Sequence, residues 1–362
     1  MAITINGSGT VTGLSVGGLP DGTVDSGTLA TDSVTAVKIP DTVESSLKSG
    51  RKNLIINGGF DVWQRGTGRV FGSNTYTSDR WTEGQYQQAG HEKVAVTDTA
   101  VPFKSAMRVT SSSTAEVSSG TRMALATMLE SVDSERYAGK TVTLSFWVRF
   151  SAATLAGATT GWYSQLSEYD SVDPVLYATG ATRTNSVNIP NGSYPTTWTK
   201  YEQTVTCGAG MKNLGARFLF SNQINTTSNS DFWYEITGVQ LEEGSVATDF
   251  EHRSYGEELA LCQRYFQYNP RVLGVWTSIS AFRFTHSFTC KMRATPTVTL
   301  TGLTDYHELY NSAGYNGLSS VSYNQTSSFG ADIKLTSSAT SGRLYGDPSL
   351  LNQTALSYDA EL

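Results

Sequence analysis

Thr141-Val142-Thr143-Leu144-Ser145-Phe146-Trp147-Val148-Arg149-Phe150 alternates apolar and polar side chains without a break. Successive side chains of a β-strand point to opposite faces, so one face of this strand is entirely apolar, from Val142 to Phe150. The other face carries hydroxyls, Trp147 and Arg149. The run therefore predicts a strand with one side in a hydrophobic core, and Gly139-Lys140 before it supplies a turn.

Further strands are expected on both sides of this run. In the last of them the apolar phase slips near Gly238, which indicates a β-bulge. A short apolar strand at Asn53–Ile56 is expected to turn sharply at Gly58 and Gly59. No helical pattern separates the strands, so the sequence predicts an all-β fold with a two-sheet antiparallel sandwich. The other predicted strands are Met107–Val109, Tyr201–Val205, Gly215–Phe220 and Phe232–Leu241.

Four segments resemble a recurring module of bacteriophage tail-fibre and related virion proteins. That module is similar in outline to the jelly-roll carbohydrate-binding modules attached to glycoside hydrolases. The resemblance runs from Arg51 to Tyr255 and implies a jelly-roll sandwich. The segments that carry it are Asn53–Arg65, Thr77–Trp81, Gly139–Val148 and Ile236–Phe250.

The N-terminal segment has an unusual period, because apolar residues recur at every fifth position. Neither a helix nor a strand has this period, so a single chain cannot bury the row. Identical chains wound about one axis can bury it, whereas the alternative is a disordered polar tail. Ile3–Thr10 and the Leu-Pro-Asp-Gly sequence at Leu19 resemble the virion-attachment end of phage fibres, which implies a homotrimer. The axial residues are Leu14, Leu19, Val24, Leu29, Val34 and Ile39.

The C-terminal third begins with a helix signal. Ser254 and Glu257 have the spacing of a capping box, and apolar residues continue at helical spacing until Asn269-Pro270. Alternation from Phe282 to Phe288 then predicts a second β-sandwich. The predicted domains are a virion-attachment and trimerisation segment at 1–50, the jelly roll at 51–253, a linker helix at 254–269 and a distal-tip sandwich at 270–362.

The amino-acid composition argues against several classes of function. Charged residues make up 16% of the 362 residues and the net charge is −6, which argues against non-specific binding to nucleic acid or anionic bilayers. No apolar run is long enough to span a membrane, and Met1 is not followed by a secretory leader. The three cysteines, Cys207, Cys262 and Cys290, are expected to be reduced.

No catalytic pattern is found, so we expect no enzyme. A glycan hydrolase needs two converging carboxylates, and the sequence brings no two of its acids together. His91, His252, His286 and His307 form no metal-binding pattern. The resemblance places Asp61 and Glu235 where related modules hold a structural calcium, but further ligands cannot be named and we expect no cofactor. The acids considered were Asp61, Asp79, Glu168, Asp170, Asp173 and Glu235.

Two stretches have the composition of a glycan site, in which aromatic rings stack on sugar rings and polar groups take the hydroxyls. The alternative for both is that the aromatics fill long loops or lie between subunits. We prefer the second stretch, because a fibre anchored at its N-terminus presents its far end to the host. The candidates are Trp162, Tyr163 and Tyr169 in the first and Tyr306, His307, Tyr310, Tyr315 and Tyr323 in the second.

The sequence thus predicts a phage virion structural protein. It is a trimeric tail fibre or spike that attaches by its N-terminus to other virion proteins and binds host surface polysaccharide without cleaving it. A head or neck decoration with the same architecture and a polysaccharide depolymerase are the alternatives. The expected location is the virion, assembled in the host cytoplasm and exposed on the particle surface.

Overall fold

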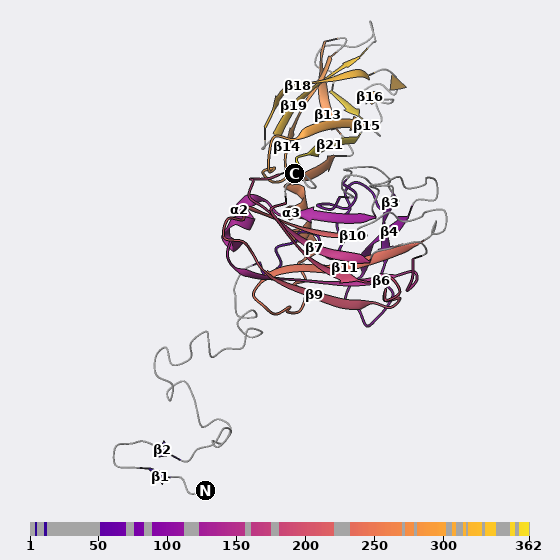
Figure 1. Ribbon diagram of the computed structural model, residues 1–362. Coiled ribbons are helices and arrows are strands. Elements are labelled where there is room, and N and C mark those ends of the chain that lie inside the picture. The colour runs from indigo at the N-terminus through magenta and orange to yellow at the C-terminus, as the bar shows by residue number, and fades with distance from the viewer. Residues whose placement is uncertain are drawn as a thin grey trace. The chain divides into compact units, whose positions relative to one another are not determined.

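The alternating run forms strand β6, Thr141–Phe150, and its apolar side chains are buried as predicted. β6 lies in a five-stranded antiparallel sheet that faces a four-stranded one (Figure 1). The first sheet contains, in order, β3 Ala89–Ala95, β4 Ser105–Ser111, β11 Trp233–Glu243, β6 and β9 Thr199–Thr206. The second contains β5 Ala124–Met128, β10 Asn213–Phe220, β7 Trp162–Tyr169 and β8 Arg183–Ile189.

The computed structural model separates into two compact units, Met1–Ser49 and Gly50–Leu362. In the first, β1 Thr4–Ile5 pairs with β2 Val11–Thr12. The axial ladder residues Leu14, Leu19, Val24, Leu29, Val34 and Ile39 lie outside the described residues. The structure describes residues 4–5, 11–12, 51–69, 76–82, 89–111, 123–155, 161–174, 181–220, 232–269, 272–278, 281–301, 306–308, 314–315, 318–327, 330–337, 348–351 and 355–361.

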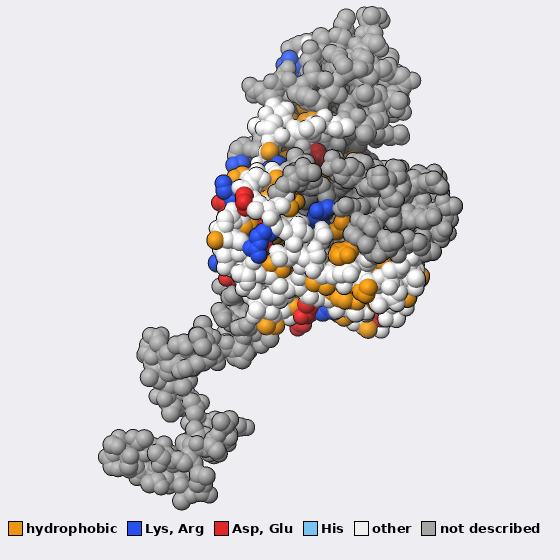
Figure 2. All heavy atoms as spheres, in the orientation of Figure 1, with side chains coloured by type: hydrophobic (Ala, Val, Ile, Leu, Met, Phe, Trp, Pro, Cys, Tyr) orange, Lys and Arg blue, Asp and Glu red, His pale blue; other side chains and the backbone are white. Residues whose placement is uncertain are grey.

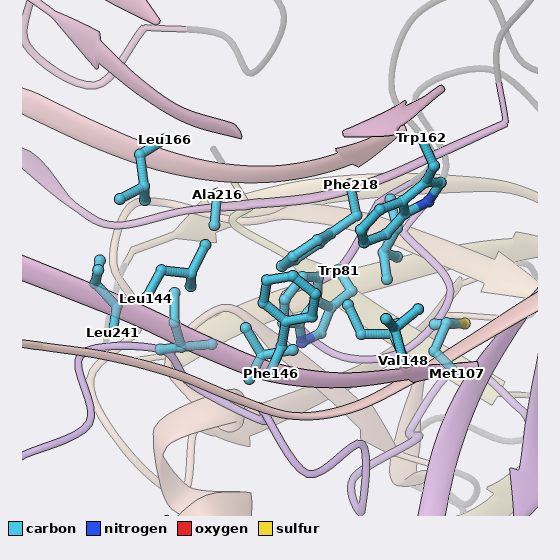
Figure 3. Packing of buried hydrophobic residues seen from close by; sticks show 14 of the residues in the cluster. Trp81, Met107, Leu144, Phe146, Val148, Trp162, Leu166, Ala216, Phe218 and Leu241 are labelled. Atoms are coloured by element: carbon cyan, nitrogen blue, oxygen red, sulfur yellow. The ribbon is translucent and has the colours of Figure 1, made fainter. Parts of the chain in front are cut away.

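The core lies between the two sheets and is rich in aromatic rings (Figure 3). Phe146 meets Phe218 edge-to-face, with ring centroids 4.9 Å apart, and Trp162 stacks on Phe218 at 5.9 Å. Trp81 is fully buried beside them. Aromatic contacts of this kind add stability beyond their buried area, so the all-β sandwich predicted from alternation is confirmed with a continuous core.

The bulge predicted in β11 is confirmed. Its pairing with β6 shifts register between Thr237 and Gln240, and Gly238 has a φ of 61°. A Cβ at Gly238 would lie 2.2 Å from the Phe103 ring, so a side chain there would meet both strain and a clash. The extra residue lets Ile236 and Leu241 both point into the core although they are an odd number of positions apart.

The segments that carry the family resemblance close the sandwich. Asn53–Ile56 is not a strand, contrary to the prediction; its backbone turns, and the Asn53 side chain bonds to Val239 and Leu241 of β11. The Asn57 side chain donates to the Val62 carbonyl, the Ser78 hydroxyl and the Asp79 carbonyl. The asparagine side chains of these motifs therefore supply hydrogen bonds to buried backbone groups of the fold.

Helix α3, Tyr255–Gln263, begins at the predicted capping box: the Ser254 hydroxyl accepts from the Glu257 N–H, and the Glu257 carboxylate accepts from the Ser254 N–H. The helix is shorter than predicted, because Phe266–Asn269 forms strand β12. Pairing with β21, Ala355–Asp359, satisfies that backbone better than two more helical turns before a proline. The other described helices are α2, Ser131–Ser134, and η2, Glu135–Tyr137. No helix among the described residues combines the length and apolar character of a membrane span.

The C-terminal part contains two antiparallel sheets. The three-stranded sheet has the order β12-β21-β15, with β15 at Thr297–Thr301. The seven-stranded sheet has the order β17-β16-β20-β13-β14-β19-β18. Its strands are β13 Val272–Ser278, β14 Ala281–Ser287, β16 Tyr306–Glu308, β17 Gly314–Tyr315, β18 Leu318–Thr326, β19 Gly330–Ser337 and β20 Pro348–Leu351.

The end of the chain packs against the jelly roll, and Figure 1 marks it beside α3. Buried Arg80 pairs with Glu361, and its guanidinium lies 3.6 Å from the centroid of the Tyr265 ring. Arg65 reaches both Glu361 and Asp359. We call these five residues the C-terminal clasp. Next to it, burial raises the pKa of Asp79 to about 6, although Arg65 and the hydrogen bonds from Gln64 oppose the shift.

Candidate functional site

The first predicted glycan stretch is largely core. Trp162 is 0% exposed and Tyr169 is 1% exposed, so neither ring face is available to stack on a sugar. Trp162 packs between the sheets (Figure 3), and Tyr169 packs against Ala126 and Met128. The alternation of β7 turns Trp162 inward, whereas Tyr169, seven positions later, lies on the other face of the strand and is buried in a separate small cluster. Tyr163, next to it, is half-buried and remains accessible.

The second stretch is divided between two edges of the seven-stranded sheet. Tyr306 of β16 lies opposite Tyr315 of β17, with His307 beside it in β16. Tyr323 belongs to β18, which is the opposite edge strand. The structure therefore does not bring Tyr323 to the other candidates. Tyr310 lies outside the described residues.

The proposed calcium pair does not form a ligand set around Glu235. Both carboxylate oxygens of Glu235 accept hydrogen bonds from arginines, and Asp61 is an exposed residue whose carbonyl accepts from Lys93. A bound cation would have to displace two guanidinium groups. Among the described ranges, no group of three histidines, cysteines or acids has the geometry to hold a metal ion.

The candidate glycosidase acids and the cysteines have structural contacts. Glu168 is buried and accepts from the Gly208 N–H and from Asn185. Asp173 accepts from the Ser131 N–H. Burial raises the pKa of the Cys207 thiol to about 11 and also raises that of Cys262, which makes thiolate chemistry unfavourable for both. All three cysteines are free, as predicted.

A different cluster lies on the outer face of the five-stranded sheet. In β6 the polar side of the alternation presents Trp147 and Arg149 outward, opposite the buried Val148. Antiparallel register sets Glu235 of β11 directly between Arg108 of β4 and Arg149. We call this cluster the Trp–Arg face. It consists of Arg108, Trp147, Arg149, Trp198, Trp233 and Glu235.

The Glu235 carboxylate accepts hydrogen bonds from both arginines. Arg108 donates to Glu235 Oε1 from Nε at 2.8 Å and from Nη2 at 2.5 Å, and Arg149 Nε donates to Oε2 at 2.6 Å. The Glu235 side chain is 1% exposed, whereas those of Arg108 and Arg149 are 29% and 28% exposed. A buried carboxylate is tolerated only when it is paired, so the two arginines compensate Glu235 while staying in contact with solvent.

Tryptophan rings flank the guanidinium groups. Arg108 lies 4.5 Å from the centroid of Trp233, and Arg149 lies 5.0 Å from that of Trp198 and 5.6 Å from that of Trp233. Trp233 and Trp147 are half-buried, and Trp147 packs on the small cluster around Phe103. Cation–π contacts restrain both partners, which fixes the guanidinium planes against the rings.

This arrangement suits a polar ligand with apolar faces. Partly exposed indole rings offer stacking surface, and guanidinium N–H groups donate to oxygen acceptors. Two buried polar atoms in this region, Trp198 Nε1 and Thr110 Oγ1, have no hydrogen-bond partner among the described residues. Figure 2 shows the described surface on one side of the molecule, where charged side chains occur in small separate groups and not as a continuous patch.

Sequence reasoning missed this face although part of the signal was available. Trp147 and Arg149 already stood out on the polar side of the predicted strand, where hydroxyl residues were otherwise found. The pairing with Arg108 and Glu235 was not available, because it depends on strand order and on the register upstream of the bulge.

Comparison with known proteins assigns the chain to no family. No family model matches the chain, and no curated protein matches it. Among solved structures, the enzymatically active domain of bacteriophage CBA120 tailspike protein 4 is 14% identical, with a TM-score of 0.33; the match covers 53% of this chain and 21% of that one. The CBM22-1 xylan-binding domain of Paenibacillus barcinonensis Xyn10C is 13% identical, with a TM-score of 0.30, over 55% of this chain and all of that one.

An arabinose-bound family 51 α-L-arabinofuranosidase is also similar, at 13% identity and a TM-score of 0.34, over 53% of this chain and 26% of that one. The chain thus spans about a fifth of the tailspike domain and about a quarter of the arabinofuranosidase. The expectation that the chain is not an enzyme is contradicted, because its structural neighbours include enzymes that act on glycans. The chain is an all-β protein, and the solved structures that match part of it at TM-scores of 0.33 or below include carbohydrate-binding modules and a phage tailspike domain.

Proposed function

We propose that this chain is a glycan-binding virion protein of a bacteriophage and that its ligand, a host surface polysaccharide, lies on the Trp–Arg face. The observation that carries the proposal is the partly exposed ring of Trp233 against both Arg108 and Arg149, with the partly exposed ring of Trp147 on the same outer face of the sheet. Rings of this kind stack on the apolar side of a pyranose. Half-buried tryptophans also keep their orientation, which lowers the entropic cost of binding.

Alanine substitutions test the site. We expect Trp233→Ala and Trp147→Ala to weaken binding to the best ligand of a glycan array by about tenfold or more, because buried tryptophans dominate binding interfaces. Titration calorimetry on the full chain measures the change. Tyr255→Ala, which removes a 60% exposed ring from α3, is the matched control and should bind normally.

Tyr306→Ala belongs in the same series, because the receptor site predicted from the sequence at the tyrosines of β16 and β17 is still untested. Loss of binding in Tyr306→Ala, with wild-type binding in both tryptophan variants, would contradict our assignment. Melting temperatures near that of the wild type would establish that the variants are folded.

We also propose that the N-terminal segment joins three chains and attaches them to the particle. The support is the five-residue period of Leu14, Leu19, Val24 and the residues that continue it. Three linked glycan sites would bind more tightly than one through their effective concentration.

Sedimentation equilibrium of the full chain is expected to give three times the 39.1 kDa chain mass. Leu19→Asp combined with Leu29→Asp should shift the mass toward one chain, because aspartate in a buried axial row costs solvation energy. A wild-type monomer at micromolar concentration would contradict the trimer.

A further inference from the structure

Charges alternate in one row across four strands of the five-stranded sheet. The register places Glu92 of β3 opposite Arg108, Arg108 opposite Glu235, and Glu235 opposite Arg149. Arg69 extends the row, since its Nη2 lies 2.8 Å from Glu92 Oε1. Each acid in the row is thus flanked by arginines, and Arg149 is the cation at the β6 end.

The two arginines of the Trp–Arg face use their hydrogen-bond donors unequally. Arg108 donates to Glu235 from Nε and Nη2, whereas Arg149 donates from Nε alone. Among the residues that the structure describes, Arg149 Nη1 and Nη2 have no hydrogen-bond acceptor. A guanidinium presents its two Nη groups as a fork, and this fork is left over on a side chain that is 28% exposed.

The fork of Arg149 is held in place. Glu235 fixes Nε, and the rings of Trp198 and Trp233 lie 5.0 Å and 5.6 Å from the guanidinium carbon. An arginine in water samples many rotamers and loses that freedom on binding. Arg149 has already lost much of it on folding, so binding a ligand there carries a lower entropic cost.

The charge of the cluster selects the ligand. Arg108 and Arg149 together carry two positive charges, and Glu235 carries one negative charge, which leaves one positive charge. Arginine has no acceptor, so it cannot satisfy the hydroxyl protons of a neutral sugar. A carboxylate offers two acceptor oxygens with the spacing of the guanidinium fork and forms two parallel charge-assisted hydrogen bonds.

We propose that the Trp–Arg face recognises an acidic sugar, with the ring stacked on indole and its carboxylate bound by the outward fork of Arg149. The inference rests on the proposed function, since it assumes that this face binds glycan, and it adds the chemical class of that glycan. Uronic and sialic acids are sugars of this class. Glu235 acts as a positioning residue that orients the fork.

The test compares acidic oligosaccharides with their methyl esters, because esterification removes the charge and keeps the ring. The probes are hexagalacturonate, hexamannuronate and 3′-sialyllactose, each with its ester, titrated into the full chain. We expect at least one acid to bind about tenfold or more tightly than its ester. Raising the salt concentration should weaken the binding of the acid and leave the binding of the ester unchanged.

Arg149→Gln removes the fork and its charge and leaves a shorter polar side chain. In this variant the acid should fall to the affinity of the ester, and a melting temperature near that of the wild type shows that the variant is folded. Arg136→Gln, at an arginine with 56% side-chain exposure in η2, is the matched control and should keep the preference.

Two outcomes overturn the inference in distinguishable ways. If a neutral glycan binds the wild type and loses affinity in Trp233→Ala, while no acid exceeds its ester, the acidic class is wrong and the proposed function stands. If no probe and no array glycan binds, or if binding is unchanged in Trp233→Ala and Trp147→Ala, the Trp–Arg face itself is not the site. If Arg149→Gln still binds the acid more tightly than its ester, the assignment of the carboxylate to the fork of Arg149 is wrong.

Discussion

Arg80→Ala is expected to lower the free energy of unfolding by about 3 kcal/mol, because it leaves a buried carboxylate without its main partner. Arg80 is 2% exposed, and the side chain of Glu361 is 4% exposed. The substitution also removes the cation–π contact with Tyr265 and the hydrogen bond to the Met128 carbonyl. Among the residues that the structure describes, the Glu361 carboxylate then keeps a single contact, a longer one of 3.4 Å to Arg65 Nη2.

Urea denaturation followed by tryptophan fluorescence measures this loss. Arg136→Ala serves as the control, since a 56% exposed arginine paired within one helical turn contributes less than about 0.5 kcal/mol. A loss below about 1 kcal/mol in Arg80→Ala would mean that the C-terminal clasp does not anchor the end of the chain. Glu361→Gln distinguishes charge from packing, because it retains the shape of the side chain.

Trp162→Ala is expected to lower the free energy of unfolding by about 3–5 kcal/mol, the usual range for removing a buried aromatic ring. Trp162 is 0% exposed and touches Phe146 and Phe218 (Figure 3) as well as Phe150 and Tyr234. The cavity left in a nearly rigid aromatic cluster cannot close fully. The glycan affinity of the folded fraction should be unchanged, because the ring does not reach the surface.

Tyr163→Ala is the matched comparison, since Tyr163 is the next residue of β7 and points away from the core. It should destabilise the chain by less than about 1.5 kcal/mol. Thermal and chemical denaturation give the stabilities, and calorimetry with the array ligand gives the affinities. Trp162→Ala with wild-type stability and lost glycan binding would restore the site first predicted from the sequence.

The strand that the sequence predicted most completely has one clean buried face. β6 alternates without a break, so its core side was readable from Val142 to Phe150. β11 was predicted with its bulge because a glycine interrupts the alternation at Gly238. In the first sandwich β3, β5, β7 and β8 were not predicted as strands; β5 is buried along its whole length, and β8 is almost entirely polar. Periodicity carries little information in either case.

The candidate site was much harder to predict than the fold. Tyrosine and tryptophan around residue 165 have the composition of a glycan site, but composition does not say which ring points inward. Conversely, Arg108, Arg149 and Glu235 lie far apart in the sequence and meet only through the order β4-β11-β6. Long-range register of this kind is set by the whole sandwich and not by a local pattern.

The single extra residue at Gly238 gives the two halves of β11 separate roles. Upstream of it, the outward side chains are Trp233 and Glu235, which belong to the Trp–Arg face. Downstream they are Gln240 and Glu242, whose side chains bond the backbone at Glu251 and Thr248 and secure the closing loop. Deleting that residue would turn the side chains of one half of β11 to the opposite face of the sheet and expose Leu241. The insertion therefore separates the outward side chains of the Trp–Arg face from those that secure the closing loop, so a substitution at Trp233 or Glu235 leaves the contacts of Gln240 and Glu242 in place.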